Sequence, residues 1–85
     1  MKNDLILIQT CGACPEQYDL NLNDINIGYL RLRHGYFSAE HVPTGEIVYT
    51  AHPEGDGIFA ESEREGYLEA ATQAILKHHL MNQHK

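Results

Sequence analysis

Three turn signals in succession constrain the fold of this chain most, because their spacing fixes how the neighbouring strands pair. Asn23-Asp24 and His34-Gly35 each favour a two-residue hairpin turn, and Pro43-Thr44-Gly45 favours a three-residue connection. The segments between the turns alternate apolar and polar residues, which is the period of a half-buried strand. The sequence therefore predicts an antiparallel meander with one open face.

The registers implied by these turns agree with one another. The implied cross-strand pairs are Leu30 with Ala39, Leu32 with Phe37, Ala39 with Tyr49 and His41 with Ile47. The predicted core face then collects Leu30, Leu32, Phe37, Ala39, His41, Ile47, Tyr49 and Ala51. The predicted open face collects Arg31, Arg33, Tyr36, Ser38, Glu40, Val48 and Thr50.

One part of the pattern conflicts with this alternation. Ile25 and Ile27 are apolar at odd positions, whereas Leu30 and Leu32 are apolar at even ones. A β-bulge near Gly28-Tyr29 would add one residue to the strand and bring both pairs to the core side. We therefore predict a bulge there.

The C-terminal third has the spacing of an amphipathic helix. Ser62 followed by Glu65 fits a capping box, and Gly66 in the first turn predicts either fraying or close packing. The stripe predicted to lie on the sheet is Leu68, Ala71, Thr72, Ile75, His79 and Leu80.

Together these elements predict an α+β fold in a single domain over residues 1–85. A four- to five-stranded antiparallel meander covers about 5–52, a loop covers 53–61, and one helix over about 62–82 packs on one face of the sheet. The segment Leu5 to Thr10 supplies a first strand or a strand extension.

Charge and hydropathy exclude several classes of function. Twelve acidic and six basic residues give a net charge of −6, which disfavours direct nucleic-acid binding. The longest early apolar run, Leu5 to Ile8, is far too short to span a membrane or to form a secretory signal. We expect an intracellular, cytoplasmic protein.

The strongest candidate site lies on the predicted open face. Arg31 and Arg33 project there beside Tyr36 and Ser38, and Tyr29 lies on the same strand. Guanidinium groups beside hydroxyl donors can hold a phosphate or a carboxylate. The alternative is a solvated face on which either arginine pairs with Glu40 or Glu46.

Cys11-Gly12-Ala13-Cys14 is the sharpest local motif, and it leaves three interpretations open. Two free thiols in a turn are favoured in an intracellular protein. Zinc binding is an alternative, although Cys11 and Cys14 supply two of the four ligands that structural zinc needs. A disulfide or redox pair is the third, and Pro15 argues against it by breaking the strand-to-helix setting of such motifs.

The residues supply no catalytic constellation. Ser38 and Ser62 lack a nucleophile-elbow context. Cys14 with His34 or His41 could form a thiolate pair, but the sequence gives no geometry for it. A chain of this length has little room for a pocket unless a homodimer supplies one. We therefore expect a binding protein, not an enzyme, with no cofactor apart from the zinc alternative.

Two segments, Cys14 to Asp19 and Gly28 to Phe37, resemble those of small proteins found in phages and prophages, as does the loop Gly55 to Phe59. The resemblance spans the chain from about Cys11 onward and carries over no activity or site residue. It implies an accessory protein that binds and blocks or sequesters a host component.

The leading hypothesis is thus a binding protein that engages a host protein or a small anionic ligand through the open face. One alternative is a zinc-stabilised interaction module that uses Cys11 and Cys14. Another is an acidic mimic of nucleic acid that inhibits a basic DNA- or RNA-binding protein. Its acidic surface would comprise Glu40, Glu46, Glu54, Asp56, Glu61, Glu63 and Glu65.

Overall fold

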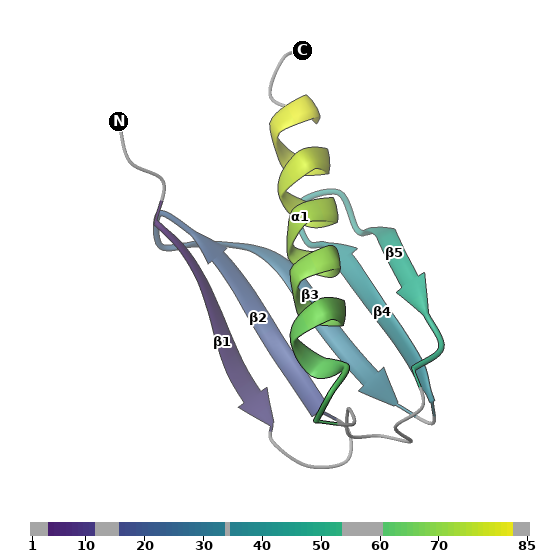
Figure 1. The fold of residues 1–85 in the computed structure, drawn as a ribbon. Helices are drawn as coiled ribbons and strands as arrows, with labels where there is room; N and C mark the ends of the chain where they lie inside the picture. The colour runs from purple at the N-terminus through teal and green to yellow at the C-terminus, as the bar shows by residue number, and fades with distance from the viewer. Residues whose placement is uncertain (1–3, 12–15, 34, 54–60, 83–85) are drawn as a thin grey trace.

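The computed structural model describes residues 4–11, 16–33, 35–53 and 61–82. Within these residues, a five-stranded antiparallel sheet in the order β1-β2-β3-β4-β5 carries one helix on one of its faces (Figure 1). The elements are β1 (Leu5–Cys11), β2 (Glu16–Leu22), β3 (Ile25–Arg33), β4 (Tyr36–His41), β5 (Glu46–Ala51) and α1 (Arg64–Asn82). The predicted α+β meander with a C-terminal helix is confirmed, and most of the predicted loop over 53–61 lies outside the described residues.

The turn residues adopt the backbone conformations that the sequence predicts for them. Asn23 and Asp24 have φ values of 51° and 71°, as a two-residue hairpin turn requires, and Gly35 and Gly45 have φ values of 73° and 75°. Leu32 pairs with Phe37, Leu30 with Ala39 and Ala39 with Tyr49, so these predicted registers are confirmed. His34 lies outside the described residues.

The predicted pairing of His41 with Ile47 is wrong by one residue. The hydrogen bond from Gly45 N to His41 O, at 2.8 Å, closes a four-residue connection, and His41 therefore pairs with Glu46. A bulge restores the register at Tyr49, so that Ile47 pairs with Glu40 and is 53% exposed on the open face. Val48 instead packs against the core, which reverses the predicted positions of these two side chains.

The predicted bulge in β3 is present at Ile27, next to the expected position. Leu20 pairs with Gly28 and Asn21 with Asn26, which leaves Ile27 as the extra residue. Ile27 is fully buried beside Leu20, as the bulge prediction required. Ile25, in contrast, is 63% exposed at the end of the hairpin, so the prediction that it joins the core is wrong.

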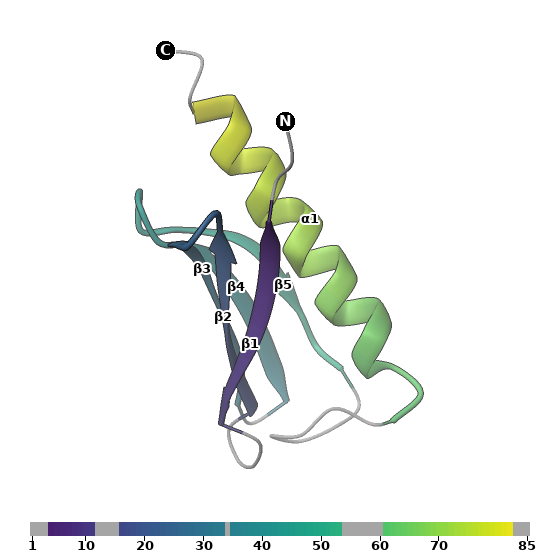
Figure 2. The same ribbon diagram turned by 90° about the vertical axis from the view of Figure 1, so that its left-hand side faces the viewer.

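The helix α1 lies across β3, β4 and β5 and covers one face of the sheet, as Figure 2 shows in side view. Its first backbone hydrogen bond runs from Tyr67 N to Glu63 O, so Glu63, not Ser62, occupies the N-cap position. Ala71 and Ile75 are fully buried, and Leu68 packs against them. Leu80 was predicted in this stripe but is 40% exposed, because it lies about 140° around the helix from Ile75.

No helix among the described residues combines the length and the apolar character needed to cross a bilayer.

The core between the helix and the sheet is closed by two kinds of contact. The ring of Phe37 meets Tyr49 and Tyr67 edge-on, with centroids 6.1 and 6.2 Å apart. At Gly28 the helix meets the strand backbone directly: a Cβ atom added there would lie 2.7 Å from Ile75 Cδ1 and 3.1 Å from Leu20 Cβ. The absence of a side chain at this position therefore sets how closely α1 approaches β3.

Gly28→Ala should lower the free energy of unfolding by about 1–3 kcal/mol, because the added methyl group overpacks a closed core. Gly66→Ala is the matched control, since no described atom lies within 4 Å of its Cβ position and alanine is the better helix former. It should raise the free energy of unfolding by up to about 1 kcal/mol. Urea denaturation of both variants measures the two effects, and an unchanged Gly28→Ala protein would contradict the proposed close approach.

Candidate functional site

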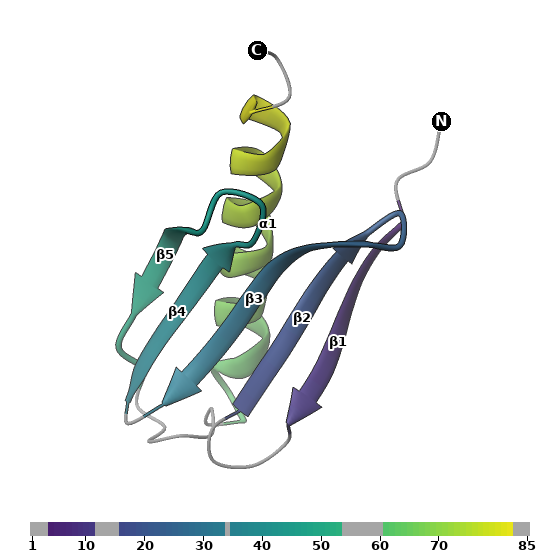
Figure 3. The same cartoon turned by 180° about the vertical axis from the view of Figure 1, so that it is seen from behind.

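Four of the five predicted binding residues gather in one hollow on the open face of the sheet. Arg31 pairs with Ser38, and Arg33 pairs with Tyr36, across the β3–β4 ladder. These four residues line a hollow of about 370 Å³. The alternating neighbours on both strands are buried under α1, so the hollow lies on the face that is turned toward the viewer in Figure 3.

Arg31 is the residue whose surroundings most suggest a ligand. Its Nε atom is buried, and no atom of the described residues accepts a hydrogen bond from it. A buried N–H group without an acceptor costs about 1–3 kcal/mol, and the oxygen of a carboxylate or phosphate would remove that cost. Arg31 therefore has a buried N–H donor that a bound anion could use.

The other residues of the hollow are more exposed. Arg33 is exposed, Tyr36 is 44% exposed, and Ser38 is half-buried. The ring of Tyr36 lies 5.6 Å from that of His52, at an interplanar angle of 52°. The sequence offered His52 only as a residue that could complete a zinc site with Cys11 and Cys14, and not as part of this hollow. It follows β5 directly and so lies beside Tyr36 at the same edge of the open face.

Tyr29 lies on the open face but outside the lining of the hollow. It pairs with Asp19 on β2 and with Glu40 on β4, so two carboxylates flank it. The sequence placed it correctly on the face that carries Arg31, because odd positions of β3 after the bulge point the same way. Tyr29 neighbours Arg31 on this face but lies further along the strand from Arg33 and Tyr36.

The ion pairs that would make this face a merely solvated surface are not seen within the described ranges. Neither Arg31 nor Arg33 forms an ion pair with Glu40 or Glu46 there. Glu46 Oε1 lies 2.7 Å from His78 Nε2, because the bulge in β5 turns the Glu46 side chain toward the helix. This carboxylate is therefore engaged on the covered face of the sheet.

The cysteine motif cannot be built into a site from the described residues. Cys11 ends β1, and Cys14 lies outside the described residues. Among the residues that the structure does describe, no group of three or more His, Cys, Asp or Glu side chains is arranged to hold a metal ion.

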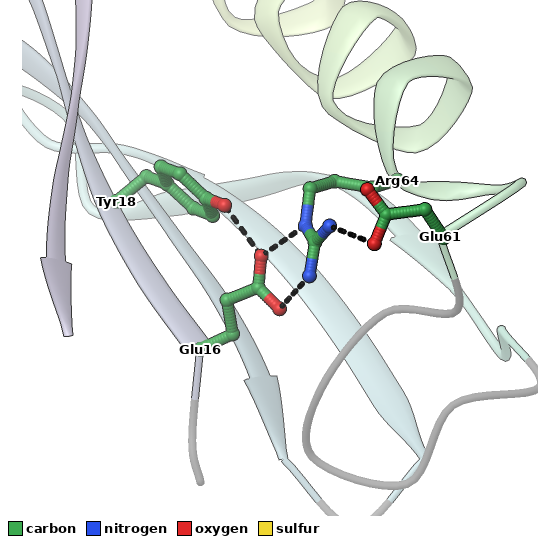
Figure 4. A network of polar contacts seen from close by, with 4 residues as sticks. All are labelled: Glu16, Tyr18, Glu61 and Arg64. Carbon is green, nitrogen blue, oxygen red and sulfur yellow. Dashed lines mark hydrogen bonds and ion pairs between the residues drawn. The ribbon is translucent and has the colours of Figure 1, made fainter. Parts of the chain in front are cut away.

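A buried charge network, which the sequence did not predict, joins β2 to the start of α1 (Figure 4). The Glu16 side chain is fully buried. Arg64 donates from Nε to Glu16 Oε2 at 2.9 Å and from Nη2 to Oε1 at 3.4 Å, while the Tyr18 hydroxyl also donates to Oε2. Arg64 Nη1 additionally donates to Glu61 Oε1 at 3.4 Å. One signal was available, since Glu16 is in phase with Tyr18, Leu20 and Leu22, which face the core.

The network changes the proton affinity of its members. Burial and the bond to Glu16 raise the pKa of Tyr18 to about 12. The hydrogen bonds to Glu16 raise the pKa of Arg64 as well, so the guanidinium group stays charged at any physiological pH. A carboxylate held by these two donors acts as a fixed anchor for the helix start.

A second buried polar cluster joins β4 to the C-terminal half of α1. His41 is 1% exposed, and its ring centroid lies 4.7 Å from that of His78 and 5.2 Å from that of His79. His41 Nδ1 lies 2.7 Å from Thr44 Oγ1, and His41 Nε2 lies 2.9 Å from His79 Nδ1. The Thr44 hydroxyl donates to the His41 carbonyl at 3.4 Å, which leaves its oxygen able to accept from the Nδ1–H tautomer of His41. Both ring nitrogens of His41 therefore have a partner within hydrogen-bond distance.

No protein-family model, curated protein or solved structure matches this chain. The resemblance to phage and prophage proteins therefore rests on the quoted segments alone.

Arg64→Met should lower the free energy of unfolding by about 3 kcal/mol, because it leaves the Glu16 carboxylate buried without its cation. This value is at the lower end for a broken buried ion pair, because the Arg64 side chain is 29% exposed to solvent. Glu61→Gln, which alters an exposed contact of the same arginine, should have no measurable effect. Urea denaturation of the two variants measures the difference, and equal stabilities would show that the Glu16 contact is unimportant.

Stability should fall as the pH is lowered through the histidine range. Burial lowers the pKa of His41 below 6.5, and His78 and His79 lower it further, while Glu46 opposes them. Below about pH 6.5 the unfolded chain therefore binds a proton that the native His41 resists, so the unfolding free energy decreases with decreasing pH.

His41→Gln should reduce the difference in unfolding free energy between pH 7.5 and pH 5.5, whereas His52→Gln, at an exposed position, should preserve it. Denaturation curves at several pH values measure the slope. A slope that is identical in wild type and His41→Gln would refute the assignment.

Proposed function

We propose that this chain is a binding protein that captures an anionic group, a carboxylate or a phosphate, in the hollow between β3 and β4. The observation that carries this proposal is the buried Nε atom of Arg31, which has no acceptor among the described residues. The anionic group would belong to a partner protein or to a small ligand. In keeping with the resemblance to phage and prophage proteins, the partner would be a host component that is blocked or sequestered.

The chemistry of the hollow suits this role. Two guanidinium groups provide forked donors that match the two oxygens of a carboxylate or phosphate, and the hydroxyls of Tyr36 and Ser38 add single donors. The four residues come from two neighbouring strands, so their backbone positions are fixed by the ladder and little ordering is needed on binding. Such a hollow favours one compact anionic group, either a planar carboxylate or a tetrahedral phosphate.

The net charge of −6 limits the kind of anion that can approach. A long polyanion such as nucleic acid would meet repulsion over most of the surface, whereas a single carboxylate or phosphate interacts mainly with the local cations. This reasoning supports a peptide side chain, a chain terminus or a small ligand over a nucleic acid.

Binding is favoured over catalysis by the residue types themselves. Arginine, tyrosine and serine in the hollow act as hydrogen-bond donors to an anion, and such recognition needs no proton transfer. We therefore propose a role in which occupancy of the site is itself the function.

Titration of the protein with inorganic phosphate, and separately with acetate, should shift the NMR signal of the Arg31 Nε–H group. Arg31→Gln should weaken binding about tenfold or more, because it removes a charge-assisted donor pair worth about 1.5–3 kcal/mol. Lys77→Gln removes the same charge from the helix on the other side of the molecule and should leave binding unchanged.

A pull-down from a bacterial lysate, analysed by mass spectrometry, extends the test to protein partners. Capture by the wild type should be lost with Arg31→Glu/Arg33→Glu. Capture that survives this double change and weakens steeply with salt would support the acidic-mimic alternative instead. An Arg31 signal that neither anion moves, with capture intact, would eliminate the hollow as the binding site.

A further inference from the structure

The outer surface of α1 carries an apolar stripe along its C-terminal half. Leu80 and Met81 are 40% and 63% exposed. Leu76 beside them is half-buried, because it also packs against the core. In the side view of Figure 2, no described element covers the side of α1 that faces away from the sheet. Neighbouring exposed apolar side chains on a small domain commonly mark a contact surface.

The same surface continues along the N-terminal half of α1, where it carries the small residues Gly66 and Ala70. Together with Gln73, Lys77 and Leu80 they recur at alternating intervals of four and three residues, which is the spacing of a helix–helix seam. Within the part of the chain that the structure describes, nothing lies within 4 Å of the position that a Cβ atom of Gly66 would take. The side chains of the seam are thus small at the Gly66 end and large at the Leu80 end. The seam is about 21 Å long at 1.5 Å per residue.

We propose that two copies of this chain associate through the outer surface of α1, with the two helices antiparallel and Gln73 at the two-fold axis. This arrangement places Leu80 of each copy opposite Gly66 of the other, and Leu76 opposite Ala70. Large side chains then fill the spaces that the small ones leave, so the two backbones approach closely along the whole seam.

Charge complementarity favours the same register. In the antiparallel pairing centred on Gln73, Glu69 of each copy lies opposite Lys77 of the other, and both residues are exposed in the single chain. The two-fold axis forms this pair twice. A parallel pairing would instead oppose Lys77 to Lys77 and Leu80 to Leu80, which joins like charges and leaves the small residues unfilled.

The dimer would have four layers, with the two helices inside and the two sheets outside. Both hollows that contain Arg31 would then lie on opposite outer surfaces, accessible to two anionic groups at once. The association rests on the helix surface alone, so it does not depend on what the hollow binds.

The charged pair allows a test by complementation. In sedimentation equilibrium, the dimeric fraction of the wild-type protein should increase as the protein concentration is raised about a hundredfold. Glu69→Lys and Lys77→Glu should each be monomeric, because each brings like charges together twice. An equimolar mixture of the two variants should form a heterodimer, because every pair across the seam is then opposite in charge, and the double variant Glu69→Lys/Lys77→Glu should dimerise on its own.

Two further variants separate the seam from the fold. Gly66→Leu should abolish dimerisation while the circular dichroism spectrum stays unchanged, since the new side chain enters open space in the single chain. Glu40→Lys, an identical charge reversal on the open face of the sheet, should leave dimerisation intact. A wild type that stays monomeric throughout, or a dimer that survives Gly66→Leu, would overturn the proposal. Phosphate and acetate titrations of the Lys77→Glu monomer report on the hollow independently.

Discussion

The contact between Ile75 and the backbone of β3 at Gly28 determines the arrangement of the rest of the molecule. It is the place where α1 approaches the sheet so closely that a methyl group would not fit. The bulge at Ile27 makes the contact possible, because the extra residue directs both Ile27 and Gly28 toward the helix. Since the helix is held against this face, the opposite face of β3 and β4 is left open, and the arginines lie there.

Two buried polar clusters hold α1 near its two ends. Arg64 in the first turn reaches Glu16 at the start of β2, and His79 near the last turn reaches His41 at the end of β4. Burying such groups costs free energy unless each is bonded, so both clusters favour the placement of the helix that satisfies them. Apolar contacts alone would tolerate sliding or rotation of α1 across the leucine-rich face. The polar clusters at either end oppose such movement.

The two surfaces that we propose for binding lie on opposite sides of this framework. The open face presents donors for an anionic group, and the outer surface of α1 presents a self-complementary seam. A protein of 85 residues buries a limited core, and association would cover apolar side chains such as Leu80 and Met81 that one copy leaves exposed. A dimer with two outward hollows would present two anion sites on opposite surfaces, so that one dimer could hold two partner molecules.

The strands, the turns and the face that carries the arginines were determined by the sequence itself, because local backbone preferences and period-two alternation are properties of neighbouring residues. The conflict between Ile25-Ile27 and Leu30-Leu32 even indicated the bulge. The exchange of Ile47 and Val48, in contrast, was decided by the four-residue connection that ends at Gly45, whose length the turn residues alone leave open.

The tertiary structure alone decided which distant side chains meet. Glu16 and Arg64 are 48 positions apart, and His41 and His79 are 38 apart, so only the path of the helix across the sheet brings them into contact. For the same reason, the absence of an acceptor for Arg31 Nε among the described residues could not be predicted from residue types. Whether a buried donor finds an acceptor depends on every chain segment that packs around it.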